Sequence, residues 1–104
     1  MAGRFFVKQD HQGPPGVAHG GVIAAALDEA MALAVHAEGI GAWTRSLRLE
    51  LSAPAAVGTF VHVEARIDVR SERRLETSAE ATGDGGERVA AATATFVRRD
   101  LDSV

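Results

Sequence analysis

Cysteine is absent from the 104 residues of this chain. Without it, a disulfide framework, a thiolate metal site and a cysteine nucleophile are all excluded. An excess of positive charge is also lacking, because 11 basic residues stand against 14 acidic ones and give a net charge of -3. Such a chain has no general electrostatic attraction to phosphate backbones or anionic lipids. We therefore expect no nucleic-acid partner and no membrane partner.

No secretion signal is expected either, since residues 1–8 contain no apolar run of the required length. We therefore expect a cytoplasmic protein. The length of the chain leaves room for one core, and we expect residues 1–104 to form a single domain. Because domains of this size leave much of their surface exposed, a homodimer or a homotetramer is expected rather than a monomer.

A long helix is predicted between Val17 and Ala37. The segment is rich in alanine, leucine and methionine, which favour helix, and it is apolar on nearly every side. Four polar side chains interrupt it: His19, Asp28, Glu29 and His36. A helix that is apolar all round must be buried on most faces, so another layer has to wrap around it. Its adjacent carboxylates argue against a membrane-spanning helix.

Beyond the helix, apolar residues recur with a period of two, which is typical of strands with one buried face. In the first such strand the apolar side chains take odd positions: Trp43, Leu47, Leu49 and Leu51. The even positions are polar and begin with Thr44, while Arg45 is the exception to the alternation. The pattern therefore places Trp43 on the face of the leucines and Thr44 on the other face.

Further strands are predicted at about residues 4–7, 59–70, 75–81 and 87–98, and a glycine-rich hairpin joins the last two. The order β-α-β-β-β-β predicts an α+β fold. A curved antiparallel sheet would wrap around one long central helix, the arrangement called a hotdog fold. The edge strands of such a sheet need pairing, and joining two sheets edge to edge would give a homodimer.

The tripeptide His19-Gly20-Gly21 stands where an extended loop becomes the helix. The first N–H groups of a helix lack partners within it and lie at its positive end. We therefore expect the N–H groups of Gly20 and Gly21 to be free to polarise a carbonyl and stabilise an oxyanion. A glycine pair also permits tight packing of the helix against a sheet, and two glycines alone favour that structural explanation.

Two adjacent carboxylates, Asp28 and Glu29, lie in the middle of this apolar helix. Burying a carboxylate is costly unless it is paired or used, so a functional site is indicated. At about 100° per residue, Asp28 falls on nearly the same face as Gly21, whereas Glu29 shares a face with His36. We therefore assign Asp28 to the site of the glycines, and Glu29 to an exposed strip or a subunit contact.

Together these residues resemble the PaaI-type acyl-CoA thioesterases of the hotdog-fold thioesterase superfamily. The resemblance rests on Gly16-Val17-Ala18-His19-Gly20-Gly21, on Asp28 nine positions after His19, and on the strand that begins Trp43-Thr44-Arg45-Ser46-Leu47. It runs from about His11 to Phe96. This combined spacing is far more specific than the HGG tripeptide alone.

The resemblance implies hydrolysis of an acyl-CoA thioester to a free acid and CoA. Asp28 would act as the general base or the nucleophile, and Gly20 would supply the N–H that binds the oxyanion. Thr44 would help to place water from the partner subunit, and His19 would mainly order the loop. These four residues are therefore the candidate catalytic residues.

The segment His11-Gln12-Gly13-Pro14-Pro15-Gly16 resembles a subgroup that includes mammalian long-chain acyl-CoA thioesterases. Many relatives carry an asparagine six residues before the histidine, where this chain has Gly13. The role of that asparagine is therefore absent here, or it has moved to His11 or Gln12.

Three arginines, Arg70, Arg73 and Arg74, cluster at a predicted turn. Arginine can hold phosphate bidentately, and CoA carries a phosphorylated ADP end, so these residues and Gly21 are candidates for CoA binding. A plain solvated turn is the alternative for each arginine. His62 lies on the polar side of a strand, where a solvated histidine is the ordinary explanation. Because no histidine pair has ligand spacing with a carboxylate, we predict neither a metal nor another cofactor.

Two other functions remain open, because fold alone does not decide among them. A hotdog hydratase or dehydratase would use a histidine and a carboxylate for proton transfer on the acyl chain. The segment His11-Gln12-Gly13-Pro14 faintly resembles such a site, but Asp28 follows the HGG turn at the thioesterase spacing. A noncatalytic acyl-CoA-binding hotdog protein is the other alternative.

Overall fold

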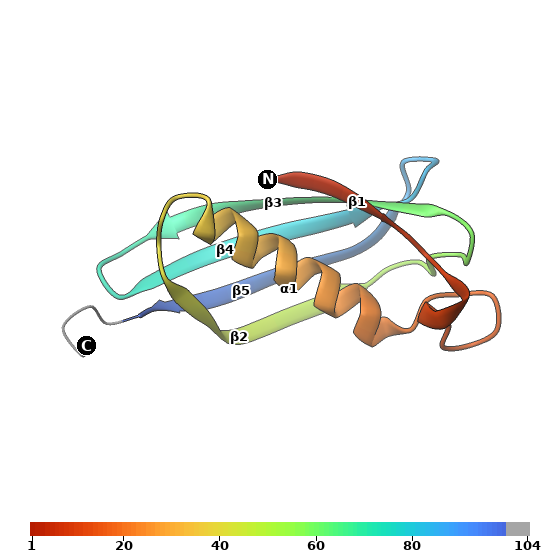
Figure 1. Cartoon of the computed structure of the whole chain (residues 1–104), viewed down its shortest axis with the longest axis horizontal. Coiled ribbons are helices and arrows are strands. Elements are labelled where there is room, and N and C mark those ends of the chain that lie inside the picture. Colours follow the sequence, from red (N-terminus) through yellow and green to blue (C-terminus); the bar gives the residue numbers. More distant parts are fainter. Residues whose placement is uncertain (100–104) are drawn as a thin grey trace.

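The computed structural model describes residues 1–99, in which one α-helix lies across a five-stranded antiparallel sheet (Figure 1). The helix, α1, extends over Gly20–His36 and is preceded by the short 3₁₀ turn η1, Gln9–His11. The strands are β1 (Ala2–Phe6), β2 (Ala42–Leu51), β3 (Phe60–Arg70), β4 (Arg74–Thr82) and β5 (Arg88–Arg98). Their spatial order is β1-β3-β4-β5-β2. The predicted α+β hotdog fold, a curved sheet around one long helix, is confirmed.

The helix packs on the sheet through a stripe of aliphatic side chains. This stripe has the spacing of one helical face and consists of Ile23, Leu27, Met31 and Val35, all buried. The sheet opposes it with small residues, among which the buried alanines are Ala65, Ala79, Ala81, Ala90, Ala92 and Ala94. Small side chains let the helix backbone approach the sheet closely. Within residues 1–99, no helix is both long and apolar enough to cross a bilayer.

The opposite side of α1 and the neighbouring strand β2 remain open in a single chain. Leu33 on the helix is 45% exposed, and Leu47 and Leu51 on β2 are 40% and 54% exposed. Strand β2 also lies at one edge of the sheet, with β5 as its neighbour. The expected burial of the helix on most faces is therefore not reached within one copy of the chain.

A bulge in β2 reverses the facing of its first residues. The pairing of β2 with β5 shifts just after Thr44, which lies opposite the buried Phe96, so that Arg45 is the extra residue. Thr44 consequently faces α1, and Trp43 faces outward with 58% of its surface exposed. The prediction that Trp43 shares a face with the leucines is wrong, because one extra residue exchanges the two faces of a strand.

A second irregularity acts in the same way on β3. The alternation of apolar residues predicts Val69 on the buried face, together with Val63 and Ile67. The pairing with β4 shifts between Ile67 and Val69, and Val69 is 54% exposed. Both departures from the predicted facing therefore occur at shifts of register.

Removing the side chain of Leu27 is expected to destabilise the fold strongly. Leu27 is fully buried between α1 and the sheet, so Leu27→Ala should lower the free energy of unfolding by about 2–5 kcal/mol. Leu27→Met keeps the volume and should cost less than about 1.5 kcal/mol. Urea denaturation followed by circular dichroism measures both values. An equal loss for the two variants would contradict the proposed tight packing at this position.

Candidate active site

The start of α1 is built around His19. Its backbone is extended, with φ -64° and ψ 139°, and its Nδ1 accepts a hydrogen bond of 2.8 Å from the Gly21 N–H. Its carbonyl oxygen accepts the N–H groups of Val22 and Ile23 at 3.0 and 3.3 Å. Of the first four N–H groups of α1, only that of Gly20 has no acceptor within residues 1–99. The expectation of two free N–H groups is thus corrected to one, because the N-cap uses that of Gly21.

The two glycines permit different close contacts. A Cβ at Gly21 would lie 3.0 Å from His19 Nδ1, the atom that caps the helix. A Cβ at Gly20 would lie 3.0 Å from Cδ1 of Leu51, on strand β2. The leucine side chain is half exposed and can move, whereas the imidazole cannot move without losing its hydrogen bond. Gly21 therefore preserves the cap, and Gly20 keeps the backbone close to β2.

The loop before α1 is held together by its own polar side chains. Nδ1 of His11 and Oε1 of Gln12 each accept a hydrogen bond from a backbone N–H of the loop, at 3.0 and 2.7 Å. The N–H of His19 donates to the His11 carbonyl oxygen at 2.7 Å. Gly13 packs so closely that a Cβ there would lie 3.0 Å from the His19 Cα. An asparagine at position 13 would therefore crowd the backbone of His19. The side chains of His11 and Gln12 each already use one accepting atom within the loop.

A groove of about 370 Å³ opens beside Gly20. Its walls include Val17, Ile23, Leu51 and Pro54, and no charged side chain from residues 1–99 lines it. An apolar group can occupy such a groove with a carbonyl oxygen directed at the free N–H. The sequence gives no sign of this groove, because its walls come from the loop, the helix and the end of β2.

A second polar centre lies further along the helix. The Thr44 hydroxyl donates a hydrogen bond of 2.8 Å to Oδ1 of Asp28, in a partly buried position. The bulge at Arg45 makes this contact possible, because it turns Thr44 toward α1. Within residues 1–99 the carboxylate accepts no other hydrogen bond, so its second oxygen is free for chemistry.

One chain does not bring the two centres together. Gly20 and Asp28 are eight residues apart in α1, which corresponds to about 12 Å along the helix axis. An oxyanion donor and a group that attacks the same carbonyl must both lie within about 3 Å of the reacting atoms. Asp28 and Gly20 of a single copy therefore cannot act on the same carbonyl, and their combination in one site stays a prediction.

Glu29, the other carboxylate of the helix, lies on the face that the sequence predicts. Glu29 and His36 are both exposed, on the side of α1 away from the sheet. The exposed-strip interpretation of Glu29 is therefore confirmed for the single chain.

The turn between β3 and β4, which carries the arginine cluster, lies near the other end of the helix (Figure 1). Arg70 forms an ion pair with Glu38, with 3.0 Å between Nε and Oε1. The hydrogen bond from Arg70 holds the pKa of Glu38 below its usual value, and the same contact raises the pKa of Arg70. Arg73 and Arg74 are exposed at the turn between β3 and β4. Since α1 is about 25 Å long, none of the three can serve Gly20 of the same chain.

His62 has a partner that the sequence does not reveal. Its Nε2 lies 2.9 Å from Oδ1 of Asp84 in the hairpin between β4 and β5. This hydrogen bond, together with one of 3.3 Å from the Phe60 N–H, lowers the pKa of Asp84. The pair is exposed and ties the hairpin to β3, away from both polar centres. In the described part of the chain, no three His, Asp or Glu residues are placed to hold a metal ion.

Comparison with models of protein families identifies the family of this chain. The family model described as the Thioesterase superfamily matches residues 15–90. This chain belongs to the thioesterase superfamily, and the predicted resemblance is thereby confirmed. No curated protein matches it.

Solved structures support the same assignment. A mutant of the phenylacetic acid degradation protein PaaI from Thermus thermophilus is 32% identical, with a TM-score of 0.88, over 94% of this chain and 84% of that one. A Bacillus halodurans protein solved with CoA is 28% identical, with a TM-score of 0.86, over 92% and 69%. A hypothetical thioesterase from Streptococcus pneumoniae, solved with coenzyme A, is 17% identical, with a TM-score of 0.91, over 94% and 77%. Two further structures of the S. pneumoniae protein carry a threonine-to-alanine and an aspartate-to-alanine substitution, 16 positions apart.

The helix cap can be tested by changing His19. His19→Ala removes the acceptor of the Gly21 N–H, and loss of an N-cap costs about 0.5–2 kcal/mol of folding free energy. His19→Asn should retain most of the stability, because asparagine is among the best N-cap residues. Thermal unfolding of the three proteins measures the difference. An alanine variant as stable as the parent would mean that the imidazole does not cap the helix.

Proposed function

We propose that this protein hydrolyses acyl-CoA thioesters to a free acid and CoA. Its membership of the thioesterase superfamily, and its similarity to proteins solved with CoA, support this class of substrate. The hydrogen bond between Thr44 and Asp28 carries the proposal, because it holds a partly buried carboxylate in place on a largely apolar helix. The two residues are 16 positions apart, the same separation as the aspartate and the threonine replaced in the S. pneumoniae protein.

The groups present are suited to an acyl transfer to water. The Gly20 N–H donates to the thioester oxygen and stabilises the negative charge that develops on it. As general base, Asp28 takes a proton from water while the water oxygen bonds to the carbonyl carbon. The carbon–sulfur bond then breaks, and the CoA sulfur receives the proton. As nucleophile, Asp28 would instead form a mixed anhydride with release of CoA, and water would then cleave the anhydride.

The contact between Thr44 and Asp28 supports a role for Thr44 in orienting the carboxylate and the attacking water. Its hydroxyl hydrogen points to Oδ1 of Asp28, so its lone pairs remain available to accept a hydrogen bond from water. Thr44 thereby fixes the rotation of the carboxylate and can hold the attacking water beside it. The second carboxylate oxygen is then directed to the reaction.

Each complete site is proposed to combine two subunits. Strand β2 is an edge strand, and a two-fold axis near its middle would pair it antiparallel with β2 of a second copy. The end of β2 at Leu51, next to Gly20, would then lie beside Thr44 of the partner subunit. This arrangement would bring the Gly20 N–H of one copy near the partner subunit's Asp28. It would also cover the exposed leucines of β2.

The same two-fold axis supports a role for the arginine cluster in binding the phosphates of CoA. It turns the far end of the partner helix toward the groove beside Gly20. Arg73 and Arg74 of the partner subunit would then approach a bound substrate from the side of its phosphates. The ion pair with Glu38 leaves Arg70 less available for such contacts.

The alternative functions receive less support from the geometry. A hydratase needs a histidine base, but Nδ1 of both His11 and His19 accepts a hydrogen bond from the backbone. A noncatalytic binder could use the same groove but has no need of the Asp28–Thr44 pair. Release of free thiol from a panel of acyl-CoAs distinguishes hydrolysis from both.

Asp28→Asn is expected to fold, to bind CoA and to lose activity. The amide oxygen still accepts the hydrogen bond from Thr44, but the side chain can no longer take a proton or attack a thioester. We expect kcat to fall on the order of a hundredfold or more, as for other positioned acid–base groups. Thiol release gives kcat, and equilibrium dialysis with CoA tests binding.

Glu29→Gln provides the matched control on the same helix. Glu29 is exposed and faces away from Thr44, so its variant should keep kcat within about twofold of the parent. Full activity of Asp28→Asn together with an inactive Glu29→Gln would reverse the assignment of the two carboxylates.

The Gly20 N–H can be removed without removing the helix. Gly20 is the first helical residue, where proline is favoured, and the extended backbone of His19 suits a following proline. Gly20→Pro should lower kcat about a hundredfold to a thousandfold through loss of the oxyanion donor. Gly20→Ala makes the same close contact with Leu51 but retains the N–H, so it should be far more active.

The same variant tests whether the site is shared. A mixed dimer of Gly20→Pro and Asp28→Asn subunits contains one site with both defects and one with neither. Coexpression of the two inactive chains should therefore restore a substantial fraction of the parental thiol release. No recovery in isolated mixed dimers would place both groups in the same chain's site.

A further inference from the structure

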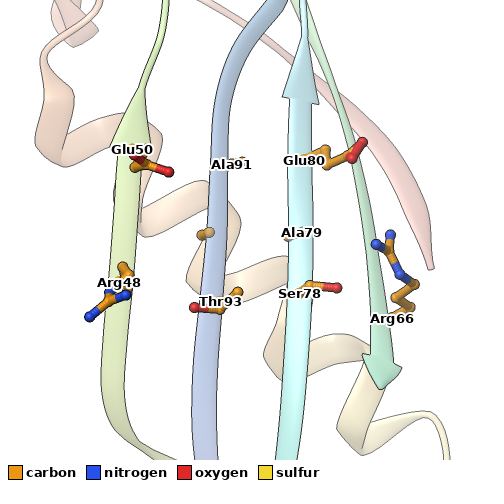
Figure 2. Close-up of a pocket in the computed structure, with 9 residues that line it drawn as sticks. Arg48, Glu50, Arg66, Ser78, Ala79, Glu80, Ala91 and Thr93 are labelled. Carbon is orange, nitrogen blue, oxygen red and sulfur yellow. The ribbon is translucent and has the colours of Figure 1, made fainter. Parts of the chain in front are cut away.

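Two hollows of the chain differ in their fitness for an acyl group. The hollow on the face of the sheet turned away from α1 has a volume of about 170 Å³, and charged side chains of both signs border it: Arg48, Glu50, Arg66 and Glu80 (Figure 2). The groove of about 370 Å³ beside Gly20 has no charged wall within residues 1–99, and its volume lies in the usual range of small-ligand pockets. The groove is therefore the better place for an acyl group.

The free N–H of Gly20, in its proposed role as oxyanion donor, fixes where that acyl group begins. Such a donor lies about 2.7–3.1 Å from the oxygen that it binds. The carbon next to the carbonyl is one C=O bond and one C–C bond further on, so it lies within about 6 Å of the donor nitrogen. A side chain in this space contacts the acyl group where it joins the thioester.

The side chain of Leu51 lies in this space. A Cβ at Gly20 would be 3.0 Å from Cδ1 of Leu51. Apart from the adjacent residues and the backbone of α1, no other atom of residues 1–99 lies within 4 Å of that position. Leu51 also lines the groove, and it is 54% exposed. The half-exposed leucine therefore borders the start of the acyl group.

The backbone of Leu51 is held in place, so only its side chain can move. Leu51 pairs with Ala90 of β5, which is fully buried. The next two N–H groups of the chain, those of Ser52 and Ala53, both donate to the Val89 carbonyl oxygen, at 2.8 and 3.2 Å. The end of β2 therefore cannot withdraw from the groove without breaking these bonds.

The other walls of the groove are fixed as well. The N–H of Ala18 donates to the Ala55 carbonyl oxygen at 2.8 Å, and this bond ties the loop before α1 to the segment after β2. Ile23, about one helical turn after Gly20, is 2% exposed and belongs to the core. Among these walls, the side chain of Leu51 is thus the one that can adjust.

The adjustment open to Leu51 is small. A shift of about half an ångström would bring Cδ1 from 3.0 Å to an ordinary contact with a Cβ at Gly20. A methyl branch on the substrate is a further carbon atom, which needs a separation of about 3.5–4.0 Å from the leucine. In the proposed two-subunit site, Thr44 of the partner subunit would lie beside Leu51 and oppose a larger shift.

We propose that Leu51 determines which acyl groups the site accepts. Its side chain admits a CH₂ group next to the thioester carbonyl and excludes a branched carbon there. The preferred substrates are therefore acyl-CoAs whose acyl group is apolar and unbranched at that carbon, and this preference rests on the hydrolysis proposed above. A branched group would hold its carbonyl oxygen away from the Gly20 N–H, and the misplaced carbonyl would react slowly.

Butyryl-CoA and isobutyryl-CoA test the proposal, because their acyl groups are isomers that differ only in the branch next to the carbonyl. Thiol release gives kcat/KM for each, and alkaline hydrolysis of the two thioesters gives their intrinsic ratio of reactivity. Relative to that ratio, the parent should prefer butyryl-CoA by about tenfold or more, the usual effect of one methylene in a tight pocket. Leu51→Ala should reduce the preference to within about threefold, chiefly by raising kcat for isobutyryl-CoA.

Two further variants are matched controls. Leu51→Ile keeps the volume and suits a strand, so it should keep most of the preference. Val69→Ala removes another aliphatic side chain that is 54% exposed, on β3 and outside the groove, and it should leave both rates unchanged. If Leu51 had only a structural role, Leu51→Ala would lower both rates by the same factor. An unchanged preference in that variant would overturn the proposal.

A binding measurement separates the specificity from hydrolysis itself. Ketone analogues of the two substrates, with a CH₂ group between the sulfur and the carbonyl, cannot be hydrolysed and differ in the same branch. Isothermal titration calorimetry should show that the parent binds the unbranched ketone more tightly and that Leu51→Ala binds both alike. That result with no thiol release from either thioester would support the role of Leu51 and reject hydrolysis. A parent that shows no preference in rates or in binding would reject the role of Leu51.

Discussion

The packing of α1 against the alanine-rich face of the sheet determines the rest of the structure. The stripe of buried aliphatic residues, with Leu27 and Met31 at its centre, prevents the helix from turning or sliding. Gly20 and Asp28 therefore stay at a fixed separation, because they belong to one rigid element. If both act on one carbonyl, no motion of a single chain can bring them together. Association would then be a condition of the chemistry as well as a source of stability.

The elements themselves could be predicted from the sequence because their signals are local. The helix is indicated by its alanine, leucine and methionine content, the strands by the alternation of apolar and polar residues, and the turns by glycine. The position of His19 at the start of α1 also followed from the HGG tripeptide. The use of its imidazole as the cap did not, because serine, threonine, asparagine and aspartate are the usual cap residues. For that reason the sequence alone suggests two free N–H groups where the structure has one.

The facing of side chains was harder to predict wherever strand register changes. Register describes how two paired strands are aligned, so it cannot be read from the alternation of residues within one strand. Arg45 interrupts the alternation of β2, and that interruption was the only local sign of the bulge. The Asp28–Thr44 contact therefore needed the pairing of β2 with β5. The groove beside Gly20 likewise depends on segments far apart in the sequence.

The bulge at Arg45 makes the candidate site vulnerable to one particular kind of genetic change. Loss of a single codon there would alter the composition of the protein hardly at all. It would nevertheless restore the alternation of β2, turning Thr44 to the outer surface and Trp43 toward the helix. No single amino-acid replacement at position 45 exchanges the faces in this way. The face on which Thr44 lies depends on the number of residues in β2 and not on their identity. In evolutionary terms, the length of β2 is constrained more tightly than the identity of the residue at its bulge.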